Sequence, residues 1–267
     1  MSVTVKICGI TSEADALAAA EAGADAIGLM FYEDSPRHVT LEQARVISAA
    51  LPPHVMRVGV FVNAKEAFVH QVLNECMINI LQFHGEETPE ECSRFPVMML
   101  KAFRVKGEET LAELEAFPTA GFLLDAYVND ALGGTGATFN WDLAVRAQEF
   151  GKPIFLAGGL TPENVATAVR KVQPFGVDVS SGVESEPGRK DPDRMRAFVA
   201  AAKGYGCRER WARGEGPGAA GLPALGLGVR RPGGLCTRTS LQGRGWGEVG
   251  VPRRRDVGAG EMVVFLS

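Results

Sequence analysis

The chain has 267 residues, 46% of them hydrophobic, and a formal net charge of −4. This length allows one large domain or two small ones with a sizeable buried core. The start lacks a basic region followed by a long apolar stretch, so we expect no secretion signal, and no apolar run is long enough to predict a transmembrane helix. The five cysteines form no CxxC pair, which argues against a disulfide framework or a zinc site. We expect a cytoplasmic protein without a membrane partner.

The composition changes near residue 207. Residues 207–267 hold ten arginines, no lysine, five acidic residues and 14 of the 32 glycines, so they carry +5 and the remainder carries −9. Richness in Gly, Pro and Arg with little periodicity predicts disorder. We therefore predict a globular domain over residues 1–206 and a disordered Gly/Arg-rich C-terminal tail over 207–267. A basic tail can bind nucleic acid, but we prefer a solvated extension, or translation beyond the natural end near residue 205, and expect no nucleic-acid partner.

The first 206 residues alternate between short apolar runs and longer amphipathic stretches. The apolar runs predict strands at residues 3–7, 26–30, 56–62, 78–82, 97–101, 121–124, 153–156 and 176–179. The stretches between them predict helices at residues 12–22, 41–51, 64–75, 90–94, 108–117, 141–150, 162–172 and 192–203. Thr11 and Thr40 precede two of these helices as N-caps, and Pro162 stands at a first helical position.

Eight strand–helix units of about 25 residues match the βα repeat of a barrel. Alternating strands and helices imply a parallel sheet with right-handed crossovers. The alternative is an open doubly wound sheet, but no glycine-rich dinucleotide fingerprint follows the first strand. We therefore predict an α/β protein with a (β/α)8 TIM-barrel fold.

The active sites of such barrels lie at the C-terminal ends of the strands. Cys8 directly follows the first predicted strand; it is either an inert core thiol or, if its pKa falls, a general base. Asp125 follows an apolar strand, where a carboxyl group suits general acid catalysis, although a helix cap or an ion pair is the simpler explanation.

Glycine and serine follow the last two predicted strands, at Gly158, Gly159, Ser180, Ser181 and Gly182. Such turns let backbone N–H groups approach an anion, and barrels often hold phosphate in these two loops. Either sequence alone is explained as well by a tight turn that binds no ligand. A phosphate site is favoured because both sequences occur, on neighbouring strands.

Two further residues have a possible substrate role. Arg37 follows a proline in a loop and is either solvated or able to pair with a ligand carboxylate. His84 follows the fourth predicted strand and is either structural or a substrate contact. In a closed barrel the strands run in the circular order 6, 7, 8, 1, 2. Asp125, the glycine and serine turns and Cys8 are therefore contiguous. A sugar phosphate held by the two turns would have Asp125 on one flank and Cys8 on the other, with Arg37 beyond the first strand.

These residues lie in motifs that resemble the phosphoribosylanthranilate isomerase family. The resemblance spans residues 3–203 and rests chiefly on KICGIT at residues 6–11 and DVSSGVE at residues 178–184. Supporting motifs are GADAIG at 23–28, SPR at 35–37, VGVFVN at 58–63, Leu124-Asp125 with GGTG at 133–136, and AGGL at 157–160. Phe83 and Asn140 depart from the Leu and Asp usual in the family, and neither is a proposed catalytic position.

The resemblance implies an Amadori rearrangement of N-(5-phosphoribosyl)anthranilate in tryptophan biosynthesis, without a metal or redox cofactor. It implies that Asp125 protonates the furanose ring oxygen and that Cys8, as a thiolate, removes the C2 proton. Arg37 would hold the anthranilate carboxylate, and backbone N–H groups around Gly159 and Ser181 would hold the phosphate. We expect a small phosphorylated substrate and a monomer or homodimer.

Other functions remain open at this point. One is a related sugar-phosphate enzyme. A synthase would need a pair of catalytic lysines together with glutamates, and Lys6 and Lys101 are the candidate lysines. A metal epimerase would need His or Asp ligands at strand ends. A dual-substrate isomerase would normally use two aspartates, where this chain has Cys8. A phosphate-binding protein without catalysis is the alternative from another class, and intact Cys8 and Asp125 argue against it.

Overall fold

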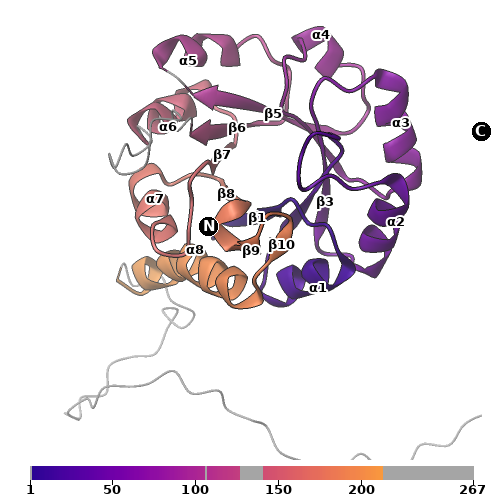
Figure 1. Cartoon of the computed structure of the whole chain (residues 1–267). Helices are drawn as coiled ribbons and strands as arrows, with labels where there is room; N and C mark the ends of the chain where they lie inside the picture. Colours follow the sequence, from indigo (N-terminus) through magenta and orange to yellow (C-terminus); the bar gives the residue numbers. More distant parts are fainter. Residues whose placement is uncertain (1, 106, 127–140, 213–267) are drawn as a thin grey trace, which may run out of the picture. The chain divides into compact units, whose positions relative to one another are not determined.

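A computed structural model describes residues 2–105, 107–126 and 141–212 of the chain (Figure 1). The described residues belong to one compact unit, Met1–Ala220. The glycine-rich segment 133–136, Asn140 and nearly all of the predicted tail lie outside the described residues. Within the described part, no helix combines the length and the apolar character needed to cross a membrane.

Eight parallel strands pair in sequence order and close into a barrel, which confirms the predicted TIM-barrel fold (Figure 1). Closure comes from the pairing of the first strand with the last, in which Lys6 stands opposite Asp178. The strands are β1 Thr4–Cys8, β2 Ala26–Met30, β3 Met56–Phe61, β4 Ile80–Phe83, β5 Met98–Val105, β6 Gly121–Ala126, β7 Ile154–Ala157 and β8 Gly176–Val179.

Helices surround the barrel, one after each strand (Figure 1). They are α1 Glu13–Glu21, α2 Leu41–Ala50, α3 Glu66–Glu75, α4 Pro89–Cys92, α5 Glu108–Leu114, α6 Trp141–Ala147 with the 3-10 helix η1 Gln148–Phe150, α7 Val165–Val172 and α8 Pro192–Ala212. Helix α8 therefore runs past residue 203, where the sequence predicted its end.

Of the three helix starts that the sequence assigned from cap or proline signals, those of α1 and α7 lie later than predicted. Ser12, and not Thr11, caps α1, since the Ser12 hydroxyl accepts from the Asp15 N–H while the Thr11 hydroxyl donates to the Gly188 carbonyl. Helix α7 begins after a turn in which the Asn164 side chain accepts from the Thr161 N–H. Pro162 therefore stands in this turn, before the helix.

The segment after β8 forms a small structure that the hydrophobic pattern did not predict. A 3-10 helix, η2 Ser181–Val183, leads into the antiparallel strands β9 Glu184–Glu186 and β10 Arg189–Lys190. These strands are polar, so they carry no alternation of apolar residues. The Lys190 N–H donates to Asp15 of α1, which ties the hairpin to the outer ring.

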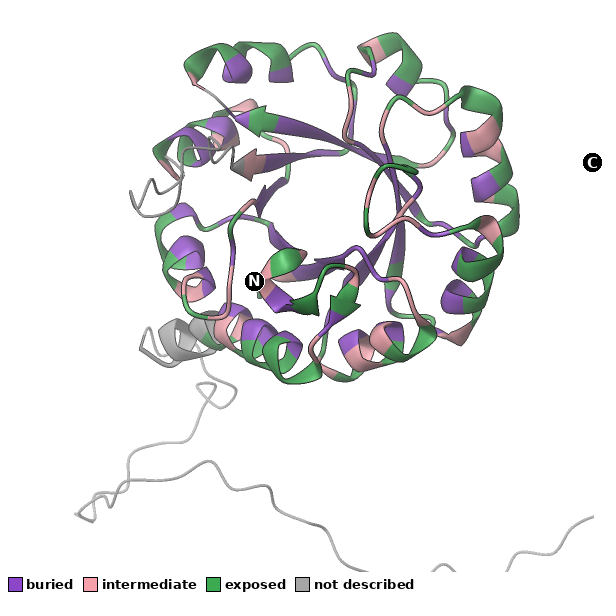
Figure 2. Ribbon diagram, in the orientation of Figure 1, coloured by how far each residue is buried: buried purple, intermediate pink, exposed green. Residues whose placement is uncertain are grey.

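The core has two layers, as expected for alternating strand faces. The outward faces of the strands pack against the inner faces of the helices, whereas the helix surfaces turned outward are exposed (Figure 2). A smaller cluster fills the barrel interior and includes Cys8, Val60, Leu123 and Phe155. The buried polar side chains Lys6, Gln82 and Asp178 belong to strands β1, β4 and β8 and sit near this interior. Lys6 and Cys8 thus share the inward face of β1.

Candidate active site

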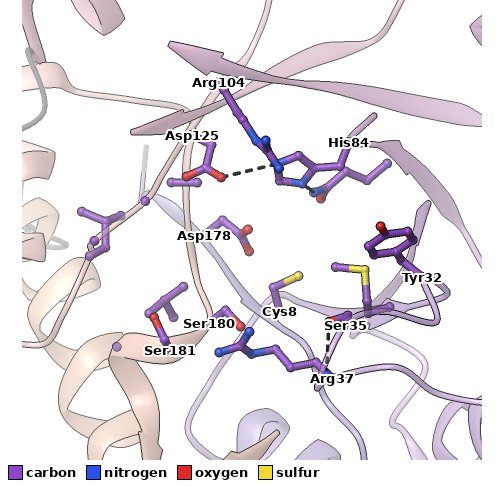
Figure 3. Close-up of a pocket in the computed structure, with 18 of the residues that line it drawn as sticks. Cys8, Tyr32, Ser35, Arg37, His84, Arg104, Asp125, Asp178, Ser180 and Ser181 are labelled. Atoms are coloured by element: carbon purple, nitrogen blue, oxygen red, sulfur yellow. Dashed lines mark hydrogen bonds and ion pairs between the residues drawn. The ribbon is translucent and has the colours of Figure 1, made fainter. Parts of the chain in front are cut away.

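A cavity of about 680 Å³ opens at the C-terminal ends of the strands (Figure 3). Its size suits a small-molecule ligand. Every site residue predicted from the sequence lines it, namely Cys8, Arg37, His84, Asp125, Gly158, Gly159, Ser180, Ser181 and Gly182. The structure also adds lining residues that the sequence did not single out, namely Tyr32, Gln82, Arg104 and Asp178. Lys6 and Lys101 are not among the described lining residues, so the lysine pair expected of a synthase is not assembled there.

Cys8 lies on the floor of the cavity, where β1 ends. Its side chain is buried, and burial raises the pKa of the thiol above its usual value, while the charge of Lys6 acts in the opposite direction. The Lys6 Nζ lies 2.9 Å from Asp178 Oδ1 of the neighbouring strand β8. A buried ion pair therefore lies beside the thiol, which makes the surroundings of Cys8 unlike an apolar core.

Asp125 is the last residue but one of β6, and its carboxyl group lies beside His84 at the cavity (Figure 3). The His84 Nε2 lies 3.4 Å from Asp125 Oδ2, and the His84 Nδ1 lies 3.2 Å from Gln82 Nε2. If the Gln82 amide donates to Nδ1, the ring proton sits on Nε2 and points at the carboxylate. The Asp125 side chain keeps 31% of its surface exposed, so it remains accessible to a ligand.

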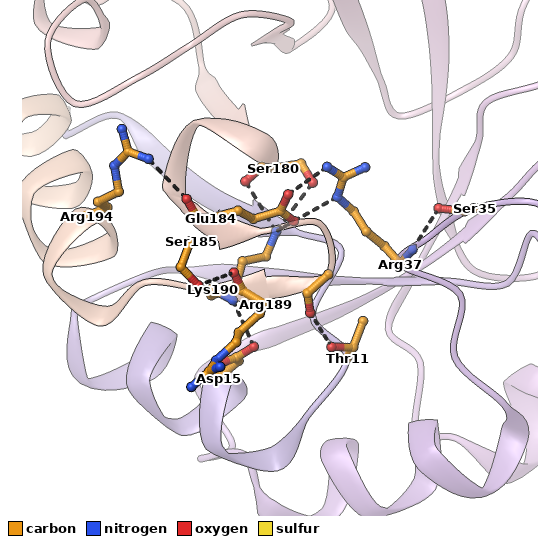
Figure 4. Close-up of polar contacts among 11 residues, drawn as sticks. Thr11, Asp15, Ser35, Arg37, Ser180, Glu184, Ser185, Arg189, Lys190 and Arg194 are labelled. Carbon is orange, nitrogen blue, oxygen red and sulfur yellow. Dashed lines mark hydrogen bonds and ion pairs between the residues drawn. The ribbon is translucent and has the colours of Figure 1, made fainter.

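Arg37 is held in place by a network of buried charges behind the cavity wall (Figure 4). Its Nε and Nη2 each donate to one oxygen of Glu184 at 2.7 Å. The Lys190 Nζ lies 2.7 Å from Glu184 Oε1 and also approaches the Ser180 carbonyl and hydroxyl oxygens, at 3.3 and 3.4 Å. Glu184 therefore links the arginine of loop 2 to the serine turn of loop 8.

Burial and pairing oppose each other at Glu184. Burial alone would raise the pKa of its carboxyl group, but the hydrogen bonds from Arg37 and Lys190 outweigh it and hold the pKa below the usual value. Burial lowers the pKa of the Lys190 ammonium, against the pull of Glu184. The Glu184 carboxylate thus balances the charges of two cations, Arg37 and Lys190.

The loops after β7 and β8 pack closely enough to act as one surface. Gly158 and Gly159 adopt left-handed φ values of 82° and 63°, which disfavour other residues. A Cβ atom on Gly182 would overlap the Leu160 carbonyl oxygen, so the close approach of the two loops requires glycine there. The Asn164 amide donates to the Gly159 carbonyl at 2.8 Å and fixes the first loop. This arrangement brings backbone groups of both loops to the cavity.

Among the residues that the structure describes, no group of three or more His, Cys, Asp or Glu side chains is placed to hold a metal ion. Two of the missed lining residues had a signal in the sequence. Gln82 and Asp178 each belong to a predicted strand and alternate inward, as Cys8 does. Glu184 ends the DVSSGVE motif, but no sequence signal joined it to Lys190, because their contact depends on a hairpin without an apolar pattern.

The geometry can be compared with known proteins. A family profile described as N-(5'-phosphoribosyl)anthranilate (PRA) isomerase matches residues 5–201. A protein of Geobacter sulfurreducens named N-(5'-phosphoribosyl)anthranilate isomerase is 55% identical over 203 residues, which cover 76% of this chain and all of that protein.

The chain belongs to the PRA isomerase family.

This membership makes the chain an enzyme, and it removes the alternative of a phosphate-binding protein without catalysis. Two crystal structures of the Thermotoga maritima PRA isomerase, one described as monomers of a dimeric enzyme, match with TM-scores of 0.70 and 0.69. Their identities are 43% and 41%, and both cover 76% of this chain and 99% of the other. A further PRA isomerase structure, in complex with reduced 1-(o-carboxyphenylamino)-1-deoxyribulose 5-phosphate, matches with a TM-score of 0.68 at 42% identity, over 76% of this chain and 99% of its own.

Replacing Glu184 with Gln should make stability depend differently on pH. Because the folded-state pKa of Glu184 lies below its unfolded value, the carboxylate stabilises the fold above that unfolded pKa. This contribution is lost as the pH falls through the folded pKa. We expect Glu184→Gln to lower the free energy of unfolding by about 1–3 kcal/mol at pH 7, and the difference from the parent to shrink below about pH 4.3.

Urea unfolding at a series of pH values measures this difference. Glu42→Gln is the matched control, because Glu42 lies on the exposed surface of α2. A difference between parent and Glu184→Gln that stays constant from pH 7 to the acid limit of folding would contradict the role assigned to the carboxylate.

Proposed function

We propose that this enzyme converts N-(5-phosphoribosyl)anthranilate into 1-(2-carboxyphenylamino)-1-deoxyribulose 5-phosphate, an aldose–ketose isomerisation of tryptophan biosynthesis. The observation that carries the proposal is the common cavity of Cys8 and Asp125, which stand on strands β1 and β6 and are separated along the barrel wall by the two glycine and serine turns. The sequence relatives named PRA isomerase and the related structure with a bound product-like molecule support it. A cytoplasmic location remains our prediction.

The phosphate is assigned to the loops after β7 and β8. Gly158, Gly159, Ser180, Ser181 and Gly182 line one side of the cavity, and glycine lets backbone N–H groups approach an anion closely. These are the loops in which TIM barrels most often bind phosphate. With the phosphate there, the ribose lies between β6 and β1, within reach of Asp125 and Cys8.

Arg37 is assigned to the anthranilate carboxylate. Glu184 already occupies its Nε and one side of Nη2. The N–H groups of Nη1 and the remaining one of Nη2 form the outer edge of the guanidinium, and this edge can pair with a carboxylate through two parallel hydrogen bonds. The fixed geometry reduces the entropy lost on binding. His84, on the opposite wall, is assigned to substrate contact and to the orientation of Asp125.

Asp125 is the proposed general acid of ring opening. It gives a proton to the furanose ring oxygen, the bond from C1 to that oxygen breaks, and the nitrogen lone pair forms a C1=N bond, which yields the protonated Schiff base. His84, which lies 3.4 Å away and faces the carboxyl group, holds it toward the cavity. A positioned acid of this kind typically contributes about 10²–10⁴-fold to a rate.

Cys8 is the proposed general base of the second step. As a thiolate it takes the proton from C2, the electron pair of that C–H bond forms C1=C2, and the C=N electrons return to nitrogen. In the resulting enolamine the C2 hydroxyl gives its proton to the Asp125 carboxylate and C1 takes the proton from the Cys8 thiol, which gives the ketone and restores both groups. The overall reaction moves hydrogen within the substrate and consumes no oxidant.

Removing either proposed catalytic group should abolish most of the turnover. Cys8→Ala and Asp125→Asn are each expected to lower kcat by about 10²–10⁴-fold, with an unchanged circular dichroism spectrum. The assay follows the loss of anthranilate-type fluorescence with freshly made phosphoribosylanthranilate. Cys76→Ala, at a buried thiol of the outer core, is the control and should keep the parent rate. A parent-like rate in either active-site variant would remove that residue from the mechanism.

Arg37→Ala should act mainly on substrate binding. Loss of a bidentate, charge-assisted pair is expected to raise KM by about tenfold or more, with a smaller effect on kcat. Steady-state kinetics with the same substrate measure both constants, and Arg45→Ala on the exposed face of α2 provides the control. An unchanged KM would mean that Arg37 does not bind the anthranilyl group.

We also propose that residues 1–206 form the catalytic domain and that 207–267 are dispensable. The family match ends at residue 201, and the cavity is lined by residues up to Gly182. A chain ending at residue 206 is expected to keep the parent kcat/KM. Since α8 continues to Ala212, a second version ending there keeps the whole helix. Loss of activity in both versions would show that the C-terminal segment takes part in function.

A further inference from the structure

Lys6 is a charged side chain buried inside the barrel, and no step of the proposed reaction uses it. Only 1% of the residue is exposed, yet its ammonium is 2.9 Å from Asp178 Oδ1. Burial would lower the pKa of Lys6, but the nearby Asp178 and Cys8 outweigh burial and raise it. Lys6 is therefore a permanent positive charge beneath the cavity floor.

This charge is directed at Cys8. Lys6 and Cys8 are two residues apart on β1 and share its inward face, and Cys8 stands opposite Gly28 of β2. A Cβ atom placed on Gly28 would lie 2.7 Å from the Cys8 sulfur and 3.0 Å from the Lys6 nitrogen. The thiol and the ammonium thus converge on the space that Gly28 leaves free, and any larger residue would separate them.

The other charges that face Cys8 come from three further segments. Asp178 of β8 raises the pKa of the thiol, and Lys190 of β10 lowers it. Arg37, in the loop after β2, also interacts with the sulfur, and its charge is already shared with Glu184. Among these groups Lys6 opposes the effect of burial on the thiol most strongly.

We propose that Lys6 is a positioning residue for catalysis: held in place by Asp178, its ammonium is the counter-ion of the Cys8 thiolate. The inference rests on the proposed role of Cys8 as the base. Lys6 keeps its proton throughout, and only the thiolate gains and loses one. Because the ammonium is fixed before substrate binds, no reorganisation is needed when the thiolate forms.

A purely structural ion pair is the competing explanation. Buried pairs seldom add stability over apolar residues of similar volume, because both charges must be desolvated. Lys101 and Glu87 form a buried pair of this kind elsewhere in the barrel, at 2.8 Å, and the thiol that interacts with it is Cys92, which does not line the cavity. This second pair provides a matched control for the effect of losing a buried lysine.

The test measures the protonation of Cys8 directly. Iodoacetamide reacts with the thiolate, so the rate of Cys8 alkylation against pH, read by mass spectrometry of the Cys8 peptide, reports the thiol pKa. In Lys6→Met the midpoint is expected to rise by about one pH unit or more, which is a tenfold lower thiolate fraction at neutral pH. The kcat for phosphoribosylanthranilate should fall by a similar factor, with KM unchanged.

Asp178→Asn should shift the midpoint in the opposite direction. Without Asp178 the thiolate becomes the closest counter-charge of Lys6, so alkylation should begin at lower pH. If the pair were merely structural, its loss would destabilise both variants but would not shift the alkylation midpoint of Cys8 in opposite directions. Lys101→Met is expected to lower stability and to leave the alkylation midpoint of Cys8 at the parent value.

An unchanged midpoint in Lys6→Met, or a shift in the same direction in Lys6→Met and Asp178→Asn, would overturn the proposal. If Lys6→Met does not fold, the double variant Lys6→Met/Asp178→Asn, which buries neither charge, is compared with Asp178→Asn alone. Its midpoint should lie higher than that of Asp178→Asn, and equal midpoints in these two variants would also overturn the proposal. If the variants show these alkylation shifts but the parent enzyme does not turn over phosphoribosylanthranilate, only the proposed function is refuted.

Discussion

The ion pair between Lys6 and Asp178 joins the two strands whose pairing closes the barrel. Both side chains point inward, so the pair can form only when β1 and β8 meet in this register. A slip of one residue would turn Lys6 and Cys8 outward toward the helices. The same register that compensates a buried charge therefore also places the thiol at the cavity floor. The position of the chemistry depends on this one closure.

A second charged network serves the upper part of the cavity. Arg37, Glu184 and Lys190 lie in three different segments, and Glu184 pairs with both cations and fixes their orientation. Glu184 binds the inner edge of the guanidinium, which leaves the outer edge for a ligand. Lys190 also lies within hydrogen-bond distance of the Ser180 hydroxyl, so Glu184 and Lys190 together connect Arg37 to the loop after β8. Rigid support of this kind fixes charged groups before the substrate binds, so that they stabilise a transition state better than water does.

Much of the fold and of the site was predictable from local pattern, but the boundaries were not. Eight alternating units predicted the barrel because the period of apolar residues is a local property. The predicted fifth strand ended at residue 101, whereas β5 continues to Val105, since its last residues pair with β6 up to Ala126. Cys8 and Asp125 were found because each directly follows a strand. The pairing of Glu184, the last residue of the DVSSGVE motif, with Lys190 was not predicted because a short polar hairpin has no apolar alternation to mark it.

The sequence by itself determined the parallel barrel, the order of its strands and the edge at which its polar residues gather, because these follow from residues close together in the chain. Only the tertiary structure decided which charges neutralise each other. Lys6 and Asp178 are separated by 172 positions, and Arg37 and Glu184 by 147. No local pattern links such residues. Their pairing exists only after the barrel has closed and removed them from water, which is also when an unpaired charge would become costly.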